Sequence, residues 1–136
     1  MTRDDVARWV ARYELAWRTP GTAMLADLFA ADLSYTPSPW AEPIRGRENL
    51  GLFWEAERRG PDERFTMTSE VVAIDVRVAV VRVTVAYGDP GDPGGPGDVR
   101  DRFWRDLWVI RFDDDGRCAA FEEWPFTPGQ PDGHET

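Results

Sequence analysis

Two acidic residues in the C-terminal third of the chain, Asp106 and Glu123, are the clearest candidates for chemistry. Both stand in stretches where apolar and polar residues alternate, as in strands whose side chains point to two faces. The Asp-Gly pair at 115–116 predicts a tight turn between these strands. The two carboxyl groups should therefore be direct or diagonal neighbours, about 5–7 Å apart at Cβ. Burial and a like charge raise carboxyl pKa values, so the pair could supply one acid and one base near neutral pH.

Tyr13 is the candidate hydrogen-bond donor of the same site. It lies within residues 3–18, where apolar residues recur at three- and four-residue spacing and predict a helix. From such a helix its hydroxyl could donate to a substrate oxygen. We therefore predict Tyr13, Asp106 and Glu123 as catalytic residues. Each also has a purely structural interpretation: Tyr13 as a core aromatic residue, and the carboxyl groups as partners of arginines at the rim, such as Arg100 or Arg102.

Strand alternation identifies the apolar side chains that should surround these groups. In the strand expected at 100–112, the face that carries Asp106 holds no other charge, so we place that face inside. The same reasoning places Cys118 and Trp124 on the outer face of the last strand, and it leaves Cys118 without a histidine partner and without a nucleophilic role. The side chains expected to line a ligand pocket are Trp17, Trp54, Phe65, Met67, Val83, Trp104, Trp108 and Phe121. The tryptophans among them could equally be ordinary core residues.

The order of predicted elements indicates an α+β domain. Helices are expected at 3–18, at 23–30 with Thr22 as N-cap, and at 47–59, and strands at 33–36, 64–75, 77–87, 100–112 and 117–126. Consecutive strands joined by short turns pair antiparallel, with the helices covering one face of the sheet. We expect one domain over residues 1–126, a Gly/Pro/Asp-rich loop at 88–98 and a disordered tail at 127–136.

Composition excludes several classes of function. The net charge of −9 and the pI of about 4.6 leave no basic footprint for nucleic acid or an anionic membrane. The single cysteine and the single histidine, His134, provide no cluster with metal-ligand spacing, so neither a metal nor a cofactor is expected. We find no signal peptide and no apolar run near 18 residues, and we expect a soluble, cytoplasmic protein.

The chain resembles the nuclear transport factor 2 superfamily, most closely its SnoaL-like and ketosteroid-isomerase-like branch. The similarity covers about residues 3–126 and rests on Arg12-Tyr13, on the segments 28–32 and 44–46, and on 108–112 with the Asp-Gly turn that follows. The resemblance implies a cone-shaped curved sheet wrapped over helices around an apolar ligand-binding pocket. It also implies a homodimer packed through the sheet, a small apolar molecule as ligand, and cofactor-independent chemistry of the isomerase or polyketide cyclase type.

The catalytic residues of that family are only partly present. Ketosteroid isomerases use a helix-one tyrosine, which Tyr13 matches, but Pro37 or a neighbour occupies the position of their proton-moving aspartate, and their oxyanion aspartate falls near Trp108. Limonene-epoxide-hydrolase-like members need an Arg-x-Asp element, which would fall on residues 82–84, where the aspartate is missing; Glu123 matches only their last-strand acid. Scytalone-dehydratase-like members need pocket histidines, and none exists here, because the single histidine, His134, lies in the expected tail. SnoaL-like cyclases need a pocket acid, which Glu123 or Asp106 could supply.

Three functions remain open at this stage. The first is an enzyme that performs acid/base chemistry on an apolar, oxygen-bearing metabolite. The second is a binding or sensing domain with the same pocket and no reaction. The third is a dimeric interaction scaffold whose interior is filled by its own aromatic side chains. Two observations separate them: whether the interior is an open cavity or is closed and filled, which would exclude both ligand-binding functions, and whether the carboxyl groups are held by arginines or one of them is buried and unpaired.

Overall fold

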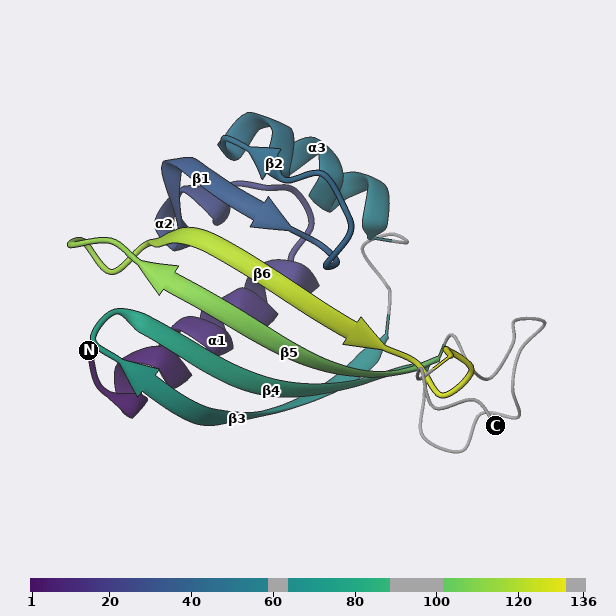
Figure 1. Cartoon of the computed structure of the whole chain (residues 1–136). Coiled ribbons are helices and arrows are strands. Elements are labelled where there is room, and N and C mark those ends of the chain that lie inside the picture. The colour runs from purple at the N-terminus through teal and green to yellow at the C-terminus, as the bar shows by residue number, and fades with distance from the viewer. Residues whose placement is uncertain (59–63, 89–101, 132–136) are drawn as a thin grey trace.

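The computed structural model describes residues 1–58, 64–88 and 102–131. Its helices are α1 (Arg3–Arg18), α2 (Leu25–Leu28) and α3 (Arg47–Glu57). Its strands are β1 (Phe29–Thr36), β2 (Ile44–Arg45), β3 (Phe65–Asp75), β4 (Val78–Tyr87), β5 (Phe103–Phe112) and β6 (Cys118–Phe126). The strands form one sheet in the order β2-β1-β6-β5-β4-β3 (Figure 1).

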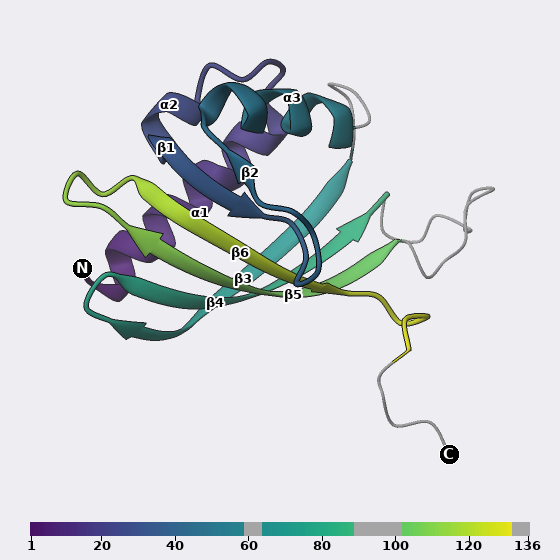
Figure 2. The same ribbon diagram turned by 45° about the horizontal axis from the view of Figure 1, so that its top comes forward.

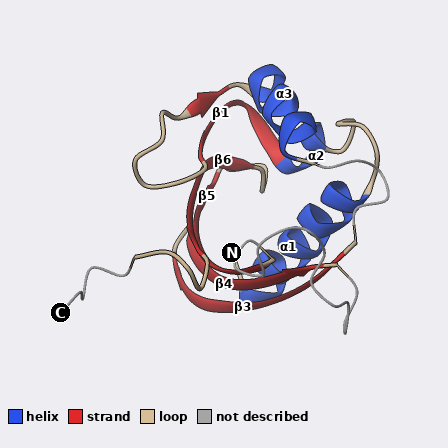
Figure 3. Cartoon of the chain, turned by 90° about the vertical axis from the view of Figure 1, so that its right-hand side faces the viewer, coloured by secondary structure: helices blue, strands red, loops and turns tan. Residues whose placement is uncertain are grey.

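The sheet is curved and mixed. Strands β3 to β6 pair antiparallel in chain order, as predicted, whereas β1 pairs parallel with β6 and antiparallel with β2. Figure 3 shows the sheet as an arc with α1 on its concave side, while α2 and α3 lie by β1. In Figure 2 the same arrangement leaves β1 and β2 beside α3 at one edge. The predicted α+β class and its cone-like shape are confirmed.

Helix α1 is capped and then tied to the sheet at both ends. Thr2 and Asp5 form a capping box, and the acidic residues of the first turn suit the positive end of the helix dipole. At the N-terminal end the Arg3 guanidinium binds the carbonyl of Val71. At the other end Arg18 donates to the carbonyl of Phe65 at 2.9 Å and lies 3.8 Å from the centre of the Phe65 ring. The helix is therefore held along the inner face of β3.

Two helix and strand boundaries differ from the sequence prediction. Helix α2 has only four residues, and its N-cap is Met24 without a side-chain bond, so the predicted capping role of Thr22 was wrong. The first strand begins at Phe29, four residues earlier than predicted, and Phe29 pairs with Cys118 of β6. Parallel pairing with β6 therefore converts a segment with helical composition into strand, since tertiary contacts override local propensity.

Cys118 lies inside, where the sequence placed it outside. The pairing of β5 with β6 shifts between Arg111, opposite Ala120, and Phe112, opposite Cys118. The residue between Cys118 and Ala120 is therefore extra, and such a bulge reverses the direction of the side chains on one side of it. Cys118 is fully buried, and burial raises the pKa of its thiol far above the ordinary value. Trp124 keeps its predicted outward direction and is 37% exposed.

Two predicted irregular segments fall largely outside the described residues. Of the loop expected at 88–98 only Gly88 is described, and of the tail expected at 127–136 the structure describes residues 127–131. There, the amide of Gln130 donates to the carbonyl of Thr127 at 3.1 Å in a short turn. Among the described helices, none combines the length and apolar character needed to cross a membrane.

The turn between β3 and β4 carries a strained residue that can be relieved. Val76 has φ of 55° and is 79% exposed, and a β-branched residue at positive φ is an outlier. We expect Val76→Asn to raise the free energy of unfolding by about 1 kcal/mol, because Asn tolerates this conformation in two-residue hairpin turns. Urea denaturation measures the change. Val78→Asn, two residues along in β4, should destabilise; an unchanged or lower midpoint for Val76→Asn would contradict the strain.

Candidate active site

The register of the sheet arranges the inward side chains in rows that run across the strands. Taken in order from β3 towards β6, successive rows are Met67–Val85–Trp104, Ser69–Val83–Asp106 and Val71–Val81–Trp108–Glu123. All three members of the first row are half-buried. Val83, Val81 and Trp108 in the next two rows are almost completely buried. The centre of the inner face, on β4 and β5, is therefore buried, whereas Ser69 on β3 is exposed and Val71 and Glu123 are half-buried.

Asp106 and Glu123 are diagonal neighbours on β5 and β6. Glu123 stands opposite Trp108, and Asp106 stands opposite Pro125. The two carboxyl groups are hydrogen-bonded to each other. The indole Nε1 of Trp108 donates to Asp106 Oδ2 at 3.4 Å. Asp106 Oδ1 is buried and receives no backbone or side-chain N–H from the described residues. The two acids therefore lie on neighbouring strands, close enough to influence each other's pKa values.

Both carboxyl groups are shifted toward their protonated forms. Burial, followed by the charge of Asp106 and the hydrogen bond to it, holds the pKa of Glu123 well above its ordinary value. Burial also raises the pKa of Asp106, but the hydrogen bond from Glu123 opposes that rise. The rise is therefore stronger at Glu123 than at Asp106. Because the groups are coupled, they titrate as a pair rather than as two independent residues.

No arginine in the described ranges forms an ion pair with either carboxyl group. Of the two rim arginines considered from the sequence, Arg102 uses its Nε to donate to the carbonyl of Tyr87 at 2.8 Å. Arg100 lies outside the described residues. Within the part of the chain that the structure describes, the pair therefore has no cation to hold both groups ionised, which agrees with their raised pKa values.

The Tyr13 hydroxyl is buried and has a partner that sequence reasoning missed. It lies 3.3 Å from the hydroxyl of Tyr35 on β1, and both side chains are at most 7% exposed. Burial raises the pKa of both phenols well above the ordinary value, and the charge of Glu123 contributes in the same direction. Tyr35 could have been found from the alternation of Leu33 and Tyr35 in the predicted first strand, since Leu33 is an evident core residue.

The remaining predicted ligand-binding residues fall into two groups. Trp54 and Phe121 both pack against Tyr13. Phe121 stacks on its ring with ring centres 5.8 Å apart, and Trp54 meets it edge-on at 5.1 Å. Trp17 is half-buried and packs edge-on against Trp54 at 4.8 Å. Phe65 lies apart from this cluster, under the Arg18 guanidinium and 5.9 Å from the Tyr87 ring.

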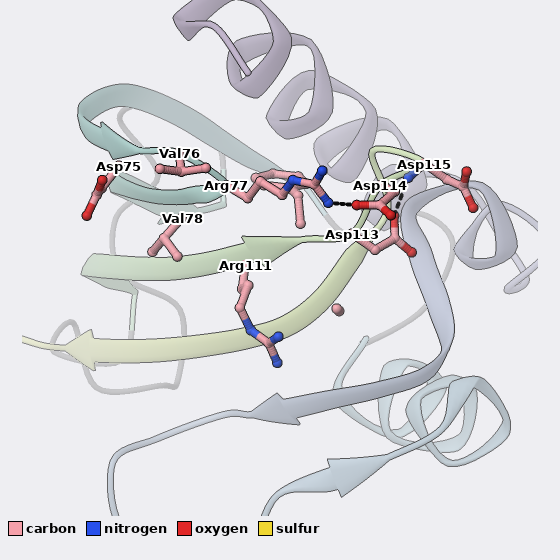
Figure 4. A pocket seen from close by; sticks show the side chains of 10 residues that line it. Asp75, Val76, Arg77, Val78, Arg111, Asp113, Asp114 and Asp115 are labelled. Atoms are coloured by element: carbon pink, nitrogen blue, oxygen red, sulfur yellow. Dashed lines mark hydrogen bonds and ion pairs between the residues drawn. The ribbon is translucent and has the colours of Figure 1, made fainter.

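A hollow at the opposite end of the sheet contains none of the predicted site residues (Figure 4). It lies between the β3–β4 and β5–β6 turns, and its volume is about 680 Å³. Arg77 pairs there with Asp114, while Asp113 Oδ1 accepts the backbone amides of Asp115 and Arg117. These charges satisfy one another or the turn itself, so the hollow is a product of two adjacent hairpins.

The raised pKa of Glu123 predicts a specific dependence of stability on pH. Because the folded-state pKa of Glu123 is raised above 4.5, native protein keeps a proton that the unfolded chain releases. This contribution to the free energy of unfolding is complete below pH 4.5 and is lost as the pH rises through the folded-state pKa, by up to about 1.4 kcal/mol per pH unit for one proton. Urea denaturation between pH 4 and 8 should show that Glu123→Gln removes this fall.

Glu122→Gln is the matched control, because Glu122 is the next residue of β6 and stands opposite outward-facing Val109. It removes the same formal charge from the other face of the sheet and should keep the fall in stability. If Glu123→Gln and Glu122→Gln change the pH profile equally, Glu123 does not hold the buried proton.

Comparisons with known proteins identify the fold. No family model matches the sequence, and no curated protein matches it. A candidate polyketide cyclase, protein SMa1630 from Sinorhizobium meliloti, is similar in structure, with a TM-score of 0.62, 20% identity, and coverage of 90% of this chain and 99% of that one. RV0760c from Mycobacterium tuberculosis matches with a TM-score of 0.66, 13% identity, and coverage of 91% and 92%. The chain therefore shares the cone-like α+β fold of these two proteins.

Proposed function

We propose that this chain binds a small apolar, oxygen-bearing molecule and catalyses its isomerisation or cyclisation without a cofactor. The observation that carries the proposal is the Asp106–Glu123 pair: Asp106 is buried, Glu123 is half-buried, burial raises the pKa of both carboxyl groups, and neither has an arginine partner in the described ranges. A buried acid beside a buried base is the arrangement that proton transfer at neutral pH requires. The half-buried row of Met67, Val85 and Trp104 provides an apolar approach to it.

The proposed reaction moves protons within this unit. Asp106, as the carboxylate, removes a proton from a carbon or oxygen of the substrate, and Glu123 delivers its own proton to a second position. Transfer of a proton from Asp106 to Glu123 along their hydrogen bond then restores the starting state. The Tyr13 hydroxyl stabilises negative charge that develops on a substrate oxygen, with Tyr35 as its hydrogen-bond partner. No electrons are exchanged with the chain.

The structural neighbours agree with this class of chemistry, since one of them is described as a candidate polyketide cyclase. The fold alone does not specify a reaction, because one fold supports many activities. A second function, ligand binding without turnover, is favoured by one observation: the Tyr13 hydroxyl is engaged by the hydroxyl of Tyr35. Binding and catalysis differ in what they require from the carboxyl pair, so substitutions at Asp106 and Glu123 separate them.

Proton abstraction can be measured directly with a model ketone. β-Tetralone is apolar and has acidic hydrogens beside its carbonyl, and its hydrogen–deuterium exchange in D₂O can be followed by NMR. We expect the protein to accelerate exchange, and Asp106→Asn and Glu123→Gln each to reduce the acceleration by about 100-fold or more, the usual size of a general acid/base contribution. Glu122→Gln should exchange at the wild-type rate. Wild-type rates in both site variants would refute the acid/base function and leave ligand binding.

We also propose that the outer face of the sheet forms a homodimer. Leu107 and Trp124 are cross-strand partners on this face, and with Phe103 and Phe126 they are between 37% and 49% exposed. Large apolar side chains gathered on one exposed face are typical of an interface. Sedimentation equilibrium should show a dimer that Leu107→Glu dissociates, while Leu52→Glu, at an exposed position on α3, should leave it intact. A wild-type monomer at micromolar concentration would contradict this proposal.

A further inference from the structure

One buried polar atom on α3 has no role in the reaction described above. Trp54 on α3 is fully buried, yet its indole Nε1 has no acceptor among the described residues. Two other buried tryptophans are paired: Trp9 Nε1 donates to the carbonyl of Leu28 at 3.0 Å, and Trp108 Nε1 donates to Asp106. A buried donor without an acceptor destabilises a fold, and such donors are rare. Trp54 therefore presents a hydrogen bond that the described part of the chain does not use.

A second buried atom, an acceptor on β5, also lacks a partner within the described ranges. Asp106 Oδ1 receives no N–H from the described residues, and a carboxylate oxygen can accept a second hydrogen bond besides the one from Glu123. The Tyr13 ring contacts both neighbourhoods, because its centre is 5.1 Å from the Trp54 ring and 4.6 Å from the Trp108 ring, whose N–H binds Asp106. Trp54, whose N–H is unused, and Trp108, whose N–H binds Asp106, thus both contact the Tyr13 ring.

Trp54 is also close to the partly exposed end of the site. Its nearest aromatic neighbour, Trp17, is half-buried and packs against it at 4.8 Å. A half-buried side chain can change rotamer at the surface, so access of a ligand to the Trp54 N–H would require Trp17 to move.

We propose that Trp54 Nε1 and Asp106 Oδ1 recognise two oxygens of a single ligand. Trp54 donates to a carbonyl or ether oxygen, and Asp106 accepts from a hydroxyl or enol. This deepens the proposed function, on which it rests, by naming the ligand class: apolar molecules that carry both an acceptor oxygen and a hydroxyl group, as hydroxyketones do. It makes Trp54 a specificity-determining residue rather than only an apolar wall.

Four probes of similar shape test the two contacts separately. 4-Hydroxybenzophenone carries both groups, benzophenone only the carbonyl, 4-benzylphenol only the hydroxyl, and diphenylmethane neither. Dissociation constants measured by calorimetry should show that wild-type protein prefers 4-hydroxybenzophenone. Trp54→Phe keeps an aromatic ring and removes the N–H, so it should weaken the two ketones by roughly tenfold and leave the other two unchanged. Asp106→Asn should change the affinity for the two phenols and not that for benzophenone.

If Trp54→Phe weakens the affinity for all four probes equally, Trp54 is only a packing residue and the inference is overturned. The inference is also overturned if none of the four probes binds. Trp40→Phe, at a position 98% exposed, is the control for loss of an indole. Denaturation of the ligand-free protein gives a second measurement: Trp9→Phe loses a hydrogen bond as well as volume, so its midpoint should fall further than that of Trp54→Phe.

Recognition of a ligand by Trp54 and catalysis by the carboxyl pair are tested by different experiments. Probe selectivity that does not depend on Trp54, together with normal proton exchange of β-tetralone, would remove this inference alone. Ketone selectivity that depends on Trp54, together with exchange that is unaffected by Asp106→Asn and Glu123→Gln, would keep the ligand class and remove catalysis.

Discussion

Packing of α1 into the concave face of the sheet is the contact on which the rest of the structure depends. Trp9 and Tyr13 present one side of the helix to Phe121 of β6, and Trp9 also meets Phe112 of β5 edge-on. Large aromatic rings remove much apolar area from water and prefer tilted or edge-on contacts, so they fill a curved space well. Arg3 and Arg18 bind backbone carbonyls of β3 and fix the helix at both ends. Sheet curvature and helix position therefore determine each other.

The same packing creates the electrostatic conditions of the site. Once α1 covers the sheet, the carboxyl groups of Asp106 and Glu123 lose water, and burial becomes the largest cause of their raised pKa values. No cation among the described residues compensates them, so the least costly state is one carboxyl group protonated and bound to the other carboxylate. Apolar packing is thus the main reason that the pKa values of both carboxyl groups are raised.

Helix α3 also packs against this interior, next to the end of α1. The Arg58 guanidinium, buried at the end of α3, binds the carbonyls of Thr19 and Gly21 that follow α1. This contact joins the last turn of α1 to α3 and keeps Trp17 against Trp54. Because the interior is close-packed, small shifts at this junction would be felt at Tyr13, which contacts Trp54 directly.

Periodicity in the sequence predicts the class of fold, the four long strands and the direction of most inward side chains. Strand alternation places Asp106 and Glu123 on one face, and the Asp-Gly turn makes them neighbours. Other features depend on pairing between distant segments, and they appear only in the folded chain. These are the early start of β1 against β6, the bulge that turns Cys118 inward, and the meeting of Tyr13 with Tyr35. The unused hydrogen-bonding atom of Trp54 belongs with them, because local composition reports which residues are apolar and not which polar atoms find a partner once the chain is packed.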